Sequence, residues 1–508
     1  MSGLPAAFSA PGEAGKTAAG ERRYGVSPVL LGLLGICLGG LLIRLWALDQ
    51  SLFGDELFTL YVVKADTLRE LLGRVVDTEN TPPLFYLLSW ICARVGDPTV
   101  TLRLPSLLAG VALIPLCWAL ARRVFGETAG LLAAGLVAAA PGLVYFSVEA
   151  RAYMLAGALA LAVVLMVCGA GGLRFPGLAG LALITAAALY SQAVVVPVIL
   201  AAGAWLVVVR PPSWTRTLAA LATGMVLFVP WLPFFIRQNE ESGQIKLAVL
   251  SLLSPVTGRS LWDVPLRAYA GHPFAEVTRV PGLSWWLFLV VAVACLALLV
   301  RLAAGVSIGP RVRQQLLLVV LAALALPVGA LILALATQQS IWNPRNLLAS
   351  VPFGLILLAV AMASVPARWR VALAIGCLVP FLVSDVHMLT DVKRPRQREA
   401  AAYAGSLMDR GVFVVTTPTL GIPGPLRDEI TSYLESNPGY RGDYAVASDP
   451  AQLGVAVARV SPRRPIAVVG FYANGFPTVT PIGDRPLLYQ RSWPGLQTVF
   501  VRVYGPSP

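Results

Sequence analysis

Charged residues are scarce in this 508-residue chain, and their scarcity defines its class. Only 13% of the residues are charged against 57% that are hydrophobic, and the mean hydropathy is +0.74. A soluble chain of this length needs more polar surface, so the composition predicts a polytopic membrane protein. The net charge is +13, but the basic residues stand in pairs between apolar runs. That pattern is typical of membrane topology, and we expect no nucleic-acid partner.

Cysteine and histidine are also rare, which limits disulfides and metal sites. All six cysteines lie within apolar runs, so we expect neither a disulfide framework nor a cysteine-based metal site. His272 and His387 are the only histidines. We therefore expect no cofactor and no obligatory metal ion. The alternative is a site for a divalent cation at Asp49, Asp55 and Glu56.

Apolar windows predict about eleven membrane spans, since about 20 apolar residues cross a bilayer as a helix. They lie near residues 29–48, 104–121, 128–146, 150–170, 175–190, 193–209, 216–236, 283–302, 314–337, 347–364 and 369–389. Residues 1–26 are expected to be a flexible cytoplasmic N-terminus, because the following apolar run is too long for a cleaved signal peptide.

The arginines predict the orientation of the spans. With the N-terminus in the cytoplasm, every short inside connection is basic, as the positive-inside rule requires. The inside arginines are Arg22, Arg23, Arg122, Arg123, Arg174, Arg210, Arg216, Arg301, Arg311, Arg313, Arg368 and Arg370. This orientation predicts a multi-pass protein of the inner or plasma membrane whose C-terminal region is extracytoplasmic.

Two regions outside the spans have their own patterns. In the first outer loop, residues 49–103, apolar residues between Leu57 and Leu72 recur at helical spacing, which predicts an interfacial amphipathic helix. Residues 83–91 form a second interfacial or re-entrant helix, because they are too few to span. Residues 391–508 predict a small α/β domain, with strands at 411–417, 465–471 and 496–503 and helices at 426–434 and 450–460.

Four polar clusters fall on the predicted outer face. They are Asp55-Glu56, Glu149–Arg151, Tyr190–Gln192 and Asn343–Arg345. Paired carboxylates at a membrane interface are costly to place. One of them could remove a proton from a hydroxyl while its neighbour orients a group or tunes the pKa. The structural alternative is that both carboxylates neutralise Lys64 or Arg103, or cap the helix that begins near Leu57.

Five motifs carry a resemblance to a known family. They are Gly54–Glu56, Thr81–Tyr86, Arg103–Ser106, Ser147–Tyr153 and Pro344–Leu348. In order and spacing they resemble the dolichyl-phosphate-mannose protein mannosyltransferases, most of all the bacterial branch that includes the lipid A aminoarabinose transferase. All are GT-C glycosyltransferases, and the resemblance covers about residues 1–400.

The resemblance implies that residues 27–390 form a GT-C catalytic domain. Such a domain transfers a sugar, with inversion, from a polyprenyl-phosphate donor to an extracytoplasmic hydroxyl of a glycolipid, a cell-wall glycan or a protein. It implies Asp55 as the catalytic carboxylate with Glu56 beside it. The donor's leaving phosphate needs cations, for which Arg345, Arg151 and Arg103 are candidates.

The remaining candidates would contact the donor or acceptor sugar. They are Glu149, Tyr153, Tyr190, Gln192, Asn343 and Tyr86. Each cluster has a structural alternative: an interfacial anchor for Arg345, an ion pair at a helix end for Glu149 and Arg151, and a polar turn for Tyr190 and Gln192. The chain departs from the family at two positions. Where the family often has His, Lys or another polar residue before the Pro-Pro pair, this chain has Thr81, and where the family often has a His, this chain has Gln192 nearby.

Two other classes stay open, a transporter or flippase of lipid-linked sugars and a non-catalytic scaffold. Transporters tend to place ionisable groups near the bilayer midplane and to repeat their halves. In this chain the charges cluster at one interface and the halves do not repeat, which favours the enzyme.

Overall fold

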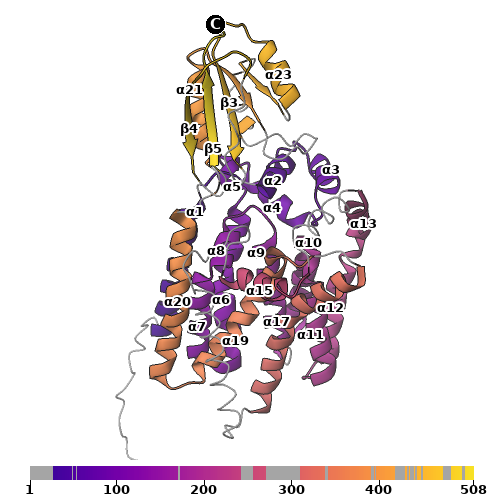
Figure 1. Ribbon diagram of the computed structural model, residues 1–508. Helices are drawn as coiled ribbons and strands as arrows, with labels where there is room; N and C mark the ends of the chain where they lie inside the picture. Colours follow the sequence, from indigo (N-terminus) through magenta and orange to yellow (C-terminus); the bar gives the residue numbers. More distant parts are fainter. Residues whose placement is uncertain are drawn as a thin grey trace, which may run out of the picture.

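The computed structural model has a helical bundle below a small sheet (Figure 1). It describes residues 27–48, 50–52, 54–169, 172–241, 256–270, 309–337, 341–390, 394, 396–417, 430–431, 434, 440, 443–447, 450–472, 482–494 and 498–508. The bundle contains α1 (Pro28–Leu48), α6 (Leu104–Phe125), α7 (Glu127–Ala139), α8 (Pro141–Ser147), α9 (Tyr153–Cys168), α10 (Phe175–Ser191), α11 (Val196–Val209), α12 (Trp214–Val226), α13 (Leu232–Glu241), α17 (Pro310–Thr337), α19 (Val351–Ala363) and α20 (Ala367–Thr390).

Short elements join these helices. They are η2 (Ala193–Val195), η3 (Val229–Trp231), α15 (Ser260–Ala270), α18 (Pro344–Leu347) and η4 (Leu348–Ser350). Helix α15 packs against α8 and α18. It therefore brings residues from the middle of the chain next to the predicted motifs.

Helices occupy ten of the eleven predicted spans, and the span expected at 283–302 lies outside the described residues. Within the described part of the chain, six helices are long and apolar enough to cross a membrane, or seven if the bent pair α7–α8 is one span. On α1, Leu31, Leu34 and Leu38 are each more than half exposed, as expected of a lipid-facing surface. The protein is thus a multi-pass membrane protein, while the count of eleven spans stays a prediction.

A buried arginine stabilises the bend between α7 and α8. The two helices meet at 59°, where Pro141 has no N–H to donate to the Val137 carbonyl. Arg44 of α1 is fully buried and donates to the carbonyl oxygens of Val137 (3.4 Å) and Ala138 (2.9 Å) and to Ser147 Oγ (2.9 Å). A cation at a helix C-terminus satisfies otherwise unpaired carbonyl groups. Arg44 thereby fixes α8, which leads into the Glu149–Arg151 motif.

The first outer loop folds into four short helices, α2 (Asp55–Val63), α3 (Leu68–Thr78), α4 (Leu84–Cys92) and α5 (Pro98–Thr101). The single amphipathic helix predicted between Leu57 and Leu72 is therefore wrong. The chain breaks because extended Thr67 caps α3, its Oγ1 accepting from the Glu70 N–H at 3.2 Å. The predicted short helix at 83–91 is confirmed as α4.

The C-terminal region has a five-stranded sheet in the order β2-β1-β3-β5-β4. Its elements are α21 (Gln397–Met408), β1 (Phe413–Thr416), β2 (Tyr444–Val446), α23 (Pro450–Ala458), β3 (Ile466–Tyr472), β4 (Leu487–Trp493) and β5 (Thr498–Tyr504). Strand β1 runs parallel to β2 and β3, whereas β5 runs antiparallel to β3 and β4. The three predicted strands and the helix near 450–460 are confirmed, and the helix predicted at 426–434 lies mostly outside the described residues.

Candidate active site

Charged side chains from five segments form one cluster of ion pairs. The first outer loop, which contributes to it, lies at the end of the bundle that faces the C-terminal sheet (Figure 1). The segments are the start of α2, the start of α6, the loop at 148–152, helix α18 and the stretch just after α20. Three of the four predicted polar clusters contribute to this centre, namely Asp55-Glu56, Glu149–Arg151 and Asn343–Arg345.

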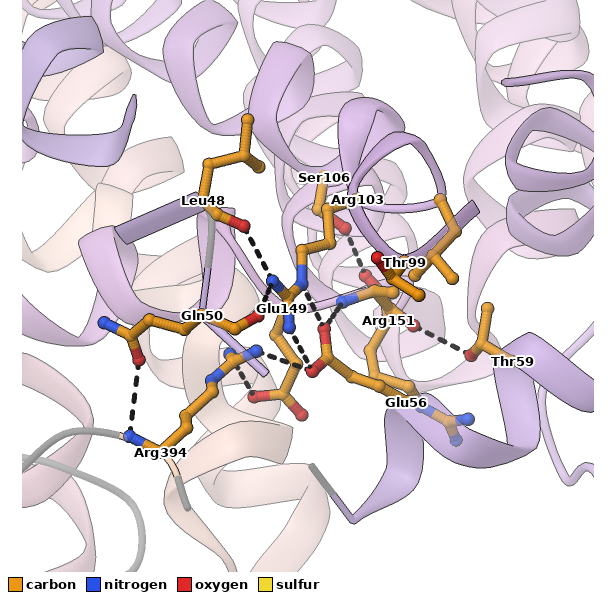
Figure 2. Close-up of polar contacts among 12 residues, drawn as sticks. Leu48, Gln50, Glu56, Thr59, Thr99, Arg103, Ser106, Glu149, Arg151 and Arg394 are labelled. Atoms are coloured by element: carbon orange, nitrogen blue, oxygen red, sulfur yellow. Dashed lines mark hydrogen bonds and ion pairs between the residues drawn. The ribbon is translucent and has the colours of Figure 1, made fainter. Parts of the chain in front are cut away.

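Glu56 lies at the middle of the centre and is fully buried. Arg103 donates to both of its carboxylate oxygens at 2.8 Å, and Arg394 donates to Oε2 at 2.6 Å (Figure 2). The Ala150 N–H donates to Oε1, also at 2.8 Å. Burial alone would raise the pKa of Glu56, but the charges of Arg103 and Arg394 and these hydrogen bonds lower it to about 2. Glu56 is therefore ionised at neutral pH, and its oxygens are surrounded by protein donors.

Arg103 is also fully buried, and its guanidinium is saturated. Besides Glu56, it donates to the carbonyl oxygens of Leu48 (2.7 Å), Gln50 (2.5 Å) and Ser51 (3.0 Å) (Figure 2). All of its N–H groups point at protein acceptors. This geometry does not fit the predicted phosphate-binding role. Arg103 instead joins the end of α1 to α2 and α6.

Arg394 is the site residue that the sequence analysis missed. Its side chain is 3% exposed and pairs with Glu56 at 2.6 Å and with Glu149 at 3.7 Å. The signal was visible, because an arginine directly follows the last predicted span on the same face as Asp55. The same stretch, however, is also where the predicted C-terminal domain of residues 391–508 begins.

Helix α2 holds the 148–152 loop through both backbone groups of Ala150. Glu56 accepts from its N–H, and Thr59 Oγ1 donates to its carbonyl oxygen at 2.8 Å. On the other side, Ser106 Oγ donates to the carbonyl oxygen of Arg151 at 3.0 Å. The loop that carries Glu149 is therefore fixed between α2 and α6.

Asp55 differs from its neighbour because it is partly exposed. Its Oδ2 pairs with Arg345 Nη1 at 2.6 Å, and the two side chains are 34% and 17% exposed. Asn343 caps α18, its Oδ1 accepting from the Arg345 N–H at 3.2 Å. Asn343 thus positions Arg345 through the backbone. Asp55 and Arg345 therefore form a partly exposed ion pair.

Glu149 is buried close to this pair, with a side chain 6% exposed. Burial raises the pKa of Glu149 to about 7, Arg394 and Arg345 oppose that shift, and the carboxylates of Glu56 and Asp55 add to it. Because that value is near neutral pH, Glu149 can exchange a proton under physiological conditions.

Arg151 is buried and forms an ion pair with Glu79 of the first outer loop. Its Nη1 donates to Glu79 Oε1 at 3.0 Å and to the Asp55 carbonyl oxygen at 3.4 Å. Its guanidinium also lies 5.9 Å from the ring centroid of Tyr86, which is fully buried and shares a 2.8 Å hydrogen bond with Thr81. Tyr86 and Arg151 therefore support the loop. Glu79 was not among the predicted site residues.

The other aromatic and amide candidates divide between the site and the bundle. Tyr153 begins α9 within electrostatic range of Arg345, and its ring packs edge-on against Phe146 at 5.1 Å. Tyr190 Oη donates to the Leu227 carbonyl oxygen at 3.2 Å. Gln192 is buried where α10 ends. Within the described part of the chain, neither Tyr190 nor Gln192 forms a hydrogen bond with the carboxylate centre.

Within the described ranges, no three His, Cys, Asp or Glu side chains gather as a group that could hold a metal ion. Of the three residues of the alternative divalent site, Asp55 and Glu56 lie within those ranges and Asp49 lies outside them. Glu56 already accepts from two guanidinium groups. The Glu56 carboxylate is therefore neutralised by arginine side chains of the protein.

Comparison with known proteins finds a family model that matches part of the chain and a solved structure with a similar fold. Residues 80–235 match the family model of the dolichyl-phosphate-mannose-protein mannosyltransferases. ArnT from Cupriavidus metallidurans bound to undecaprenyl phosphate is similar with a TM-score of 0.53 at 16% identity, over 93% of this chain and 97% of that one. No curated protein sequence matches the chain.

Two further structures are similar at lower scores. ArnT in the apo state gives 0.43 at 14% identity, over 94% of this chain and 98% of that one. The apo Archaeoglobus fulgidus oligosaccharyltransferase gives 0.44 at 12% identity, over 78% and 62%. The family match covers three of the five motifs in full, and the ArnT likeness shows the fold of almost the whole chain. Residues 80–235 are thus similar to the protein mannosyltransferase family, and the chain as a whole has the fold of ArnT.

Proposed function

We propose that the protein is an inverting glycosyltransferase that moves a hexose or pentose from a polyprenyl-phosphate donor to a hydroxyl of an extracytoplasmic acceptor. The observation that carries the proposal is the Asp55–Arg345 ion pair, which is partly exposed at 2.6 Å. Glu56, Arg103 and Arg394, by contrast, are buried. The ArnT structure that shares this fold holds undecaprenyl phosphate, which supports a lipid-linked donor.

The chemistry needs one base and one cation. Asp55 accepts the proton of the acceptor hydroxyl while its oxygen attacks the anomeric carbon of the donor sugar. The bond from that carbon to the phosphate oxygen breaks, and the electron pair leaves with the polyprenyl phosphate. Arg345 stabilises the developing negative charge, since its planar guanidinium can engage two phosphate oxygens at once. A single displacement of this kind inverts the anomeric centre.

The resting ion pair fits this order of events. Without donor, Arg345 neutralises Asp55 at 2.6 Å and holds it at the mouth of the site. A donor phosphate competes with Asp55 for the same guanidinium, and the carboxylate is then available as a base. Donor binding and base activation are coupled through Arg345.

Glu56 and Arg103 have a positioning role in this mechanism. Their 2.8 Å contacts are buried and place Asp55 at the first turn of α2, where the helix dipole favours a carboxylate. Glu149 and Tyr153 stand beside the ion pair and are candidates to contact the donor sugar. The acceptor is a glycolipid, a cell-wall glycan or a protein in the space outside the cytoplasm.

The test uses purified protein in lipid nanodiscs with a radiolabelled polyprenyl-phosphate sugar and extracytoplasmic acceptor fractions. We expect glycosylated product and free polyprenyl phosphate from wild type. Asp55→Asn should lose about 100- to 10,000-fold in rate, the range of a lost general base. The matched control is Asp77→Asn, since Asp77 is an exposed carboxylate of the same loop, 3.6 Å from Arg237. Sugar movement across the bilayer without cleavage of the phosphate bond would indicate a transporter and refute the proposal.

A further inference from the structure

Arg394 enters the active site from outside the helical bundle. It follows α20 and precedes α21, the helix that packs on β1, β3 and β5 of the C-terminal sheet. Its guanidinium is buried between Glu56 and Glu149 and lies 5.0 Å from the ring centroid of Tyr145. Figure 2 shows the side chain pointing into the centre, with its backbone N–H donating to Gln50 Oε1 at 3.4 Å.

The charge balance of the centre depends on this one side chain. Glu56 and Glu149 are two buried carboxylates, and Arg103 donates its N–H groups to Glu56 and to three carbonyl oxygens. Arg394 is therefore the buried cation that joins the two acids. Removing one partner of such a network leaves an uncompensated buried charge, which is strongly unfavourable.

The contact with Glu149 is electrostatic rather than a hydrogen bond. Arg394 Nη2 and Glu149 Oε2 lie 3.7 Å apart, and neither atom has a hydrogen-bond partner among the described residues. Glu149 is thus held by the charge of Arg394, while its backbone is fixed through Ala150. A substitution at position 394 therefore changes the charge state of Glu149 more than it changes the backbone of the 148–152 loop.

We propose that Arg394 is a positioning residue that joins Glu56 and Glu149 into one charge network, so that the active site is complete only when the segment leading to the C-terminal sheet is docked. This inference rests on the proposed glycosyltransferase function and assigns the C-terminal region a part in it. A second contact supports docking, because Arg398 donates to Thr99 Oγ1 at 2.8 Å and its N–H to Ser51 Oγ at 3.1 Å.

The network predicts a distinct pH dependence. The pKa of Glu149 is raised to about 7 by burial and by its neighbouring carboxylates, while Arg394 lowers it. The ionisable groups that face Glu149 are Arg394, Glu56, Asp55, Arg345, Tyr145 and Tyr153. Without Arg394 the pKa of Glu149 rises further, so that a higher pH is needed to ionise it. An opposite charge at this range shifts a pKa by about 1 to 3 units.

The experiment compares Arg394→Gln with wild type across pH 5 to 9 in the nanodisc assay, measuring kcat/KM. We expect a loss of about 100-fold at pH 7, the cost of a displaced catalytic geometry. The acid limb of the profile should move up by about 1 to 3 pH units. Arg394→Lys keeps the charge and should recover part of the lost rate and part of the shift of the acid limb. Where Arg394→Gln folds poorly, the double variant Arg394→Gln/Glu149→Gln should recover thermal stability, because it removes both charges of the pair.

Two neighbouring arginines provide matched controls. Arg396→Gln removes an exposed partner of Glu399, 2.7 Å away, and should match wild type in rate and in pH profile. Arg398→Gln weakens docking without touching the carboxylates and should leave the acid limb in place. An Arg394→Gln profile that coincides with that of Arg396→Gln would overturn the inference. Such a coincidence would leave the proposed glycosyltransferase function intact as long as wild type is active and Asp55→Asn is not. An inactive wild type would instead count against the proposed function itself.

Discussion

At the scale of single residues, two adjacent carboxylates have opposite environments. Glu56 is fully buried with its pKa lowered to about 2, whereas the Asp55 side chain is 34% exposed and pairs with Arg345. Since α2 begins at Asp55, consecutive side chains point in directions about 100° apart, and one turns inward while the other faces the site. The same sequence motif thus places one carboxylate inside the protein and leaves the other partly exposed.

Glu56 gives a prediction on stability and pH. Its folded pKa of about 2 lies below its ordinary value of 4.5, so its contribution is present above pH 4.5 and is lost as the pH falls toward 2. That contribution is about 3 kcal/mol. We expect Glu56→Gln to lower the Tm in detergent at pH 7, and the difference from wild type to shrink below pH 4.5. The measurement is thermal unfolding followed by tryptophan fluorescence. A difference that stays constant down to pH 3 would contradict the assignment.

At the scale of elements, the α7–α8 bend connects the bundle to the candidate active site. Arg44 satisfies the carbonyl groups that Pro141 leaves without partners, and α8 then delivers Glu149. A side chain at Gly110 of α6 would clash with Ser147, so close packing of α6 against α8 also requires a glycine. The bend was not predicted, because residues 128–146 read as one continuous apolar span.

Removing the guanidinium at this bend should destabilise the helix pair. Arg44→Met leaves the Val137 and Ala138 carbonyls and Ser147 without their donors, and each unsatisfied buried group costs about 1 to 3 kcal/mol. We expect a lower Tm and reduced transferase activity. Arg123→Met is the control, since Arg123 is exposed and makes one 3.3 Å contact with the Leu165 carbonyl. Equal effects from the two variants would exclude a special role for Arg44.

At the scale of the whole molecule, the candidate active site lies where three regions meet. The membrane bundle supplies Arg345 and Glu149, the first outer loop supplies Asp55, and the segment before the C-terminal sheet supplies Arg394. The short helices of the first outer loop lie at the end of the bundle that faces the C-terminal sheet (Figure 1). By the positive-inside rule, the basic turn at Arg122 and Arg123 belongs on the cytoplasmic side, so we predict that the end bearing these short helices faces away from the cytoplasm.

Cysteine labelling tests that orientation. Ser461 lies beside the sheet and Thr128 in the first turn of α7, and both are exposed. In intact spheroplasts, a membrane-impermeant maleimide should label Ser461→Cys and should reach Thr128→Cys only after permeabilisation. The parent chain corrects for its own cysteines. The reverse pattern would invert the proposed topology and place the reaction in the cytoplasm.

The sequence by itself determined the membrane class, the position of most helices and the order of the motifs. Apolar run length and arginine distribution are local properties that survive without a fold. The short strands were harder to predict: β4 was missed because most of its residues are exposed on both faces, which removes the alternation that marks a strand. Helix α21 was missed because its first turn carries several charges.

Tertiary structure decided which charged residue does what. Glu56 meets Arg103, Ala150 and Arg394 across 47, 94 and 338 positions of the chain. Whether a guanidinium is saturated or open to a ligand depends on those distant acceptors, and no sequence pattern contains them. Arg103 and Arg345 look alike in sequence, yet one is closed inside the protein and the other is at the surface of the site. The physical reason is that burial and hydrogen-bond satisfaction arise only when the segments pack together.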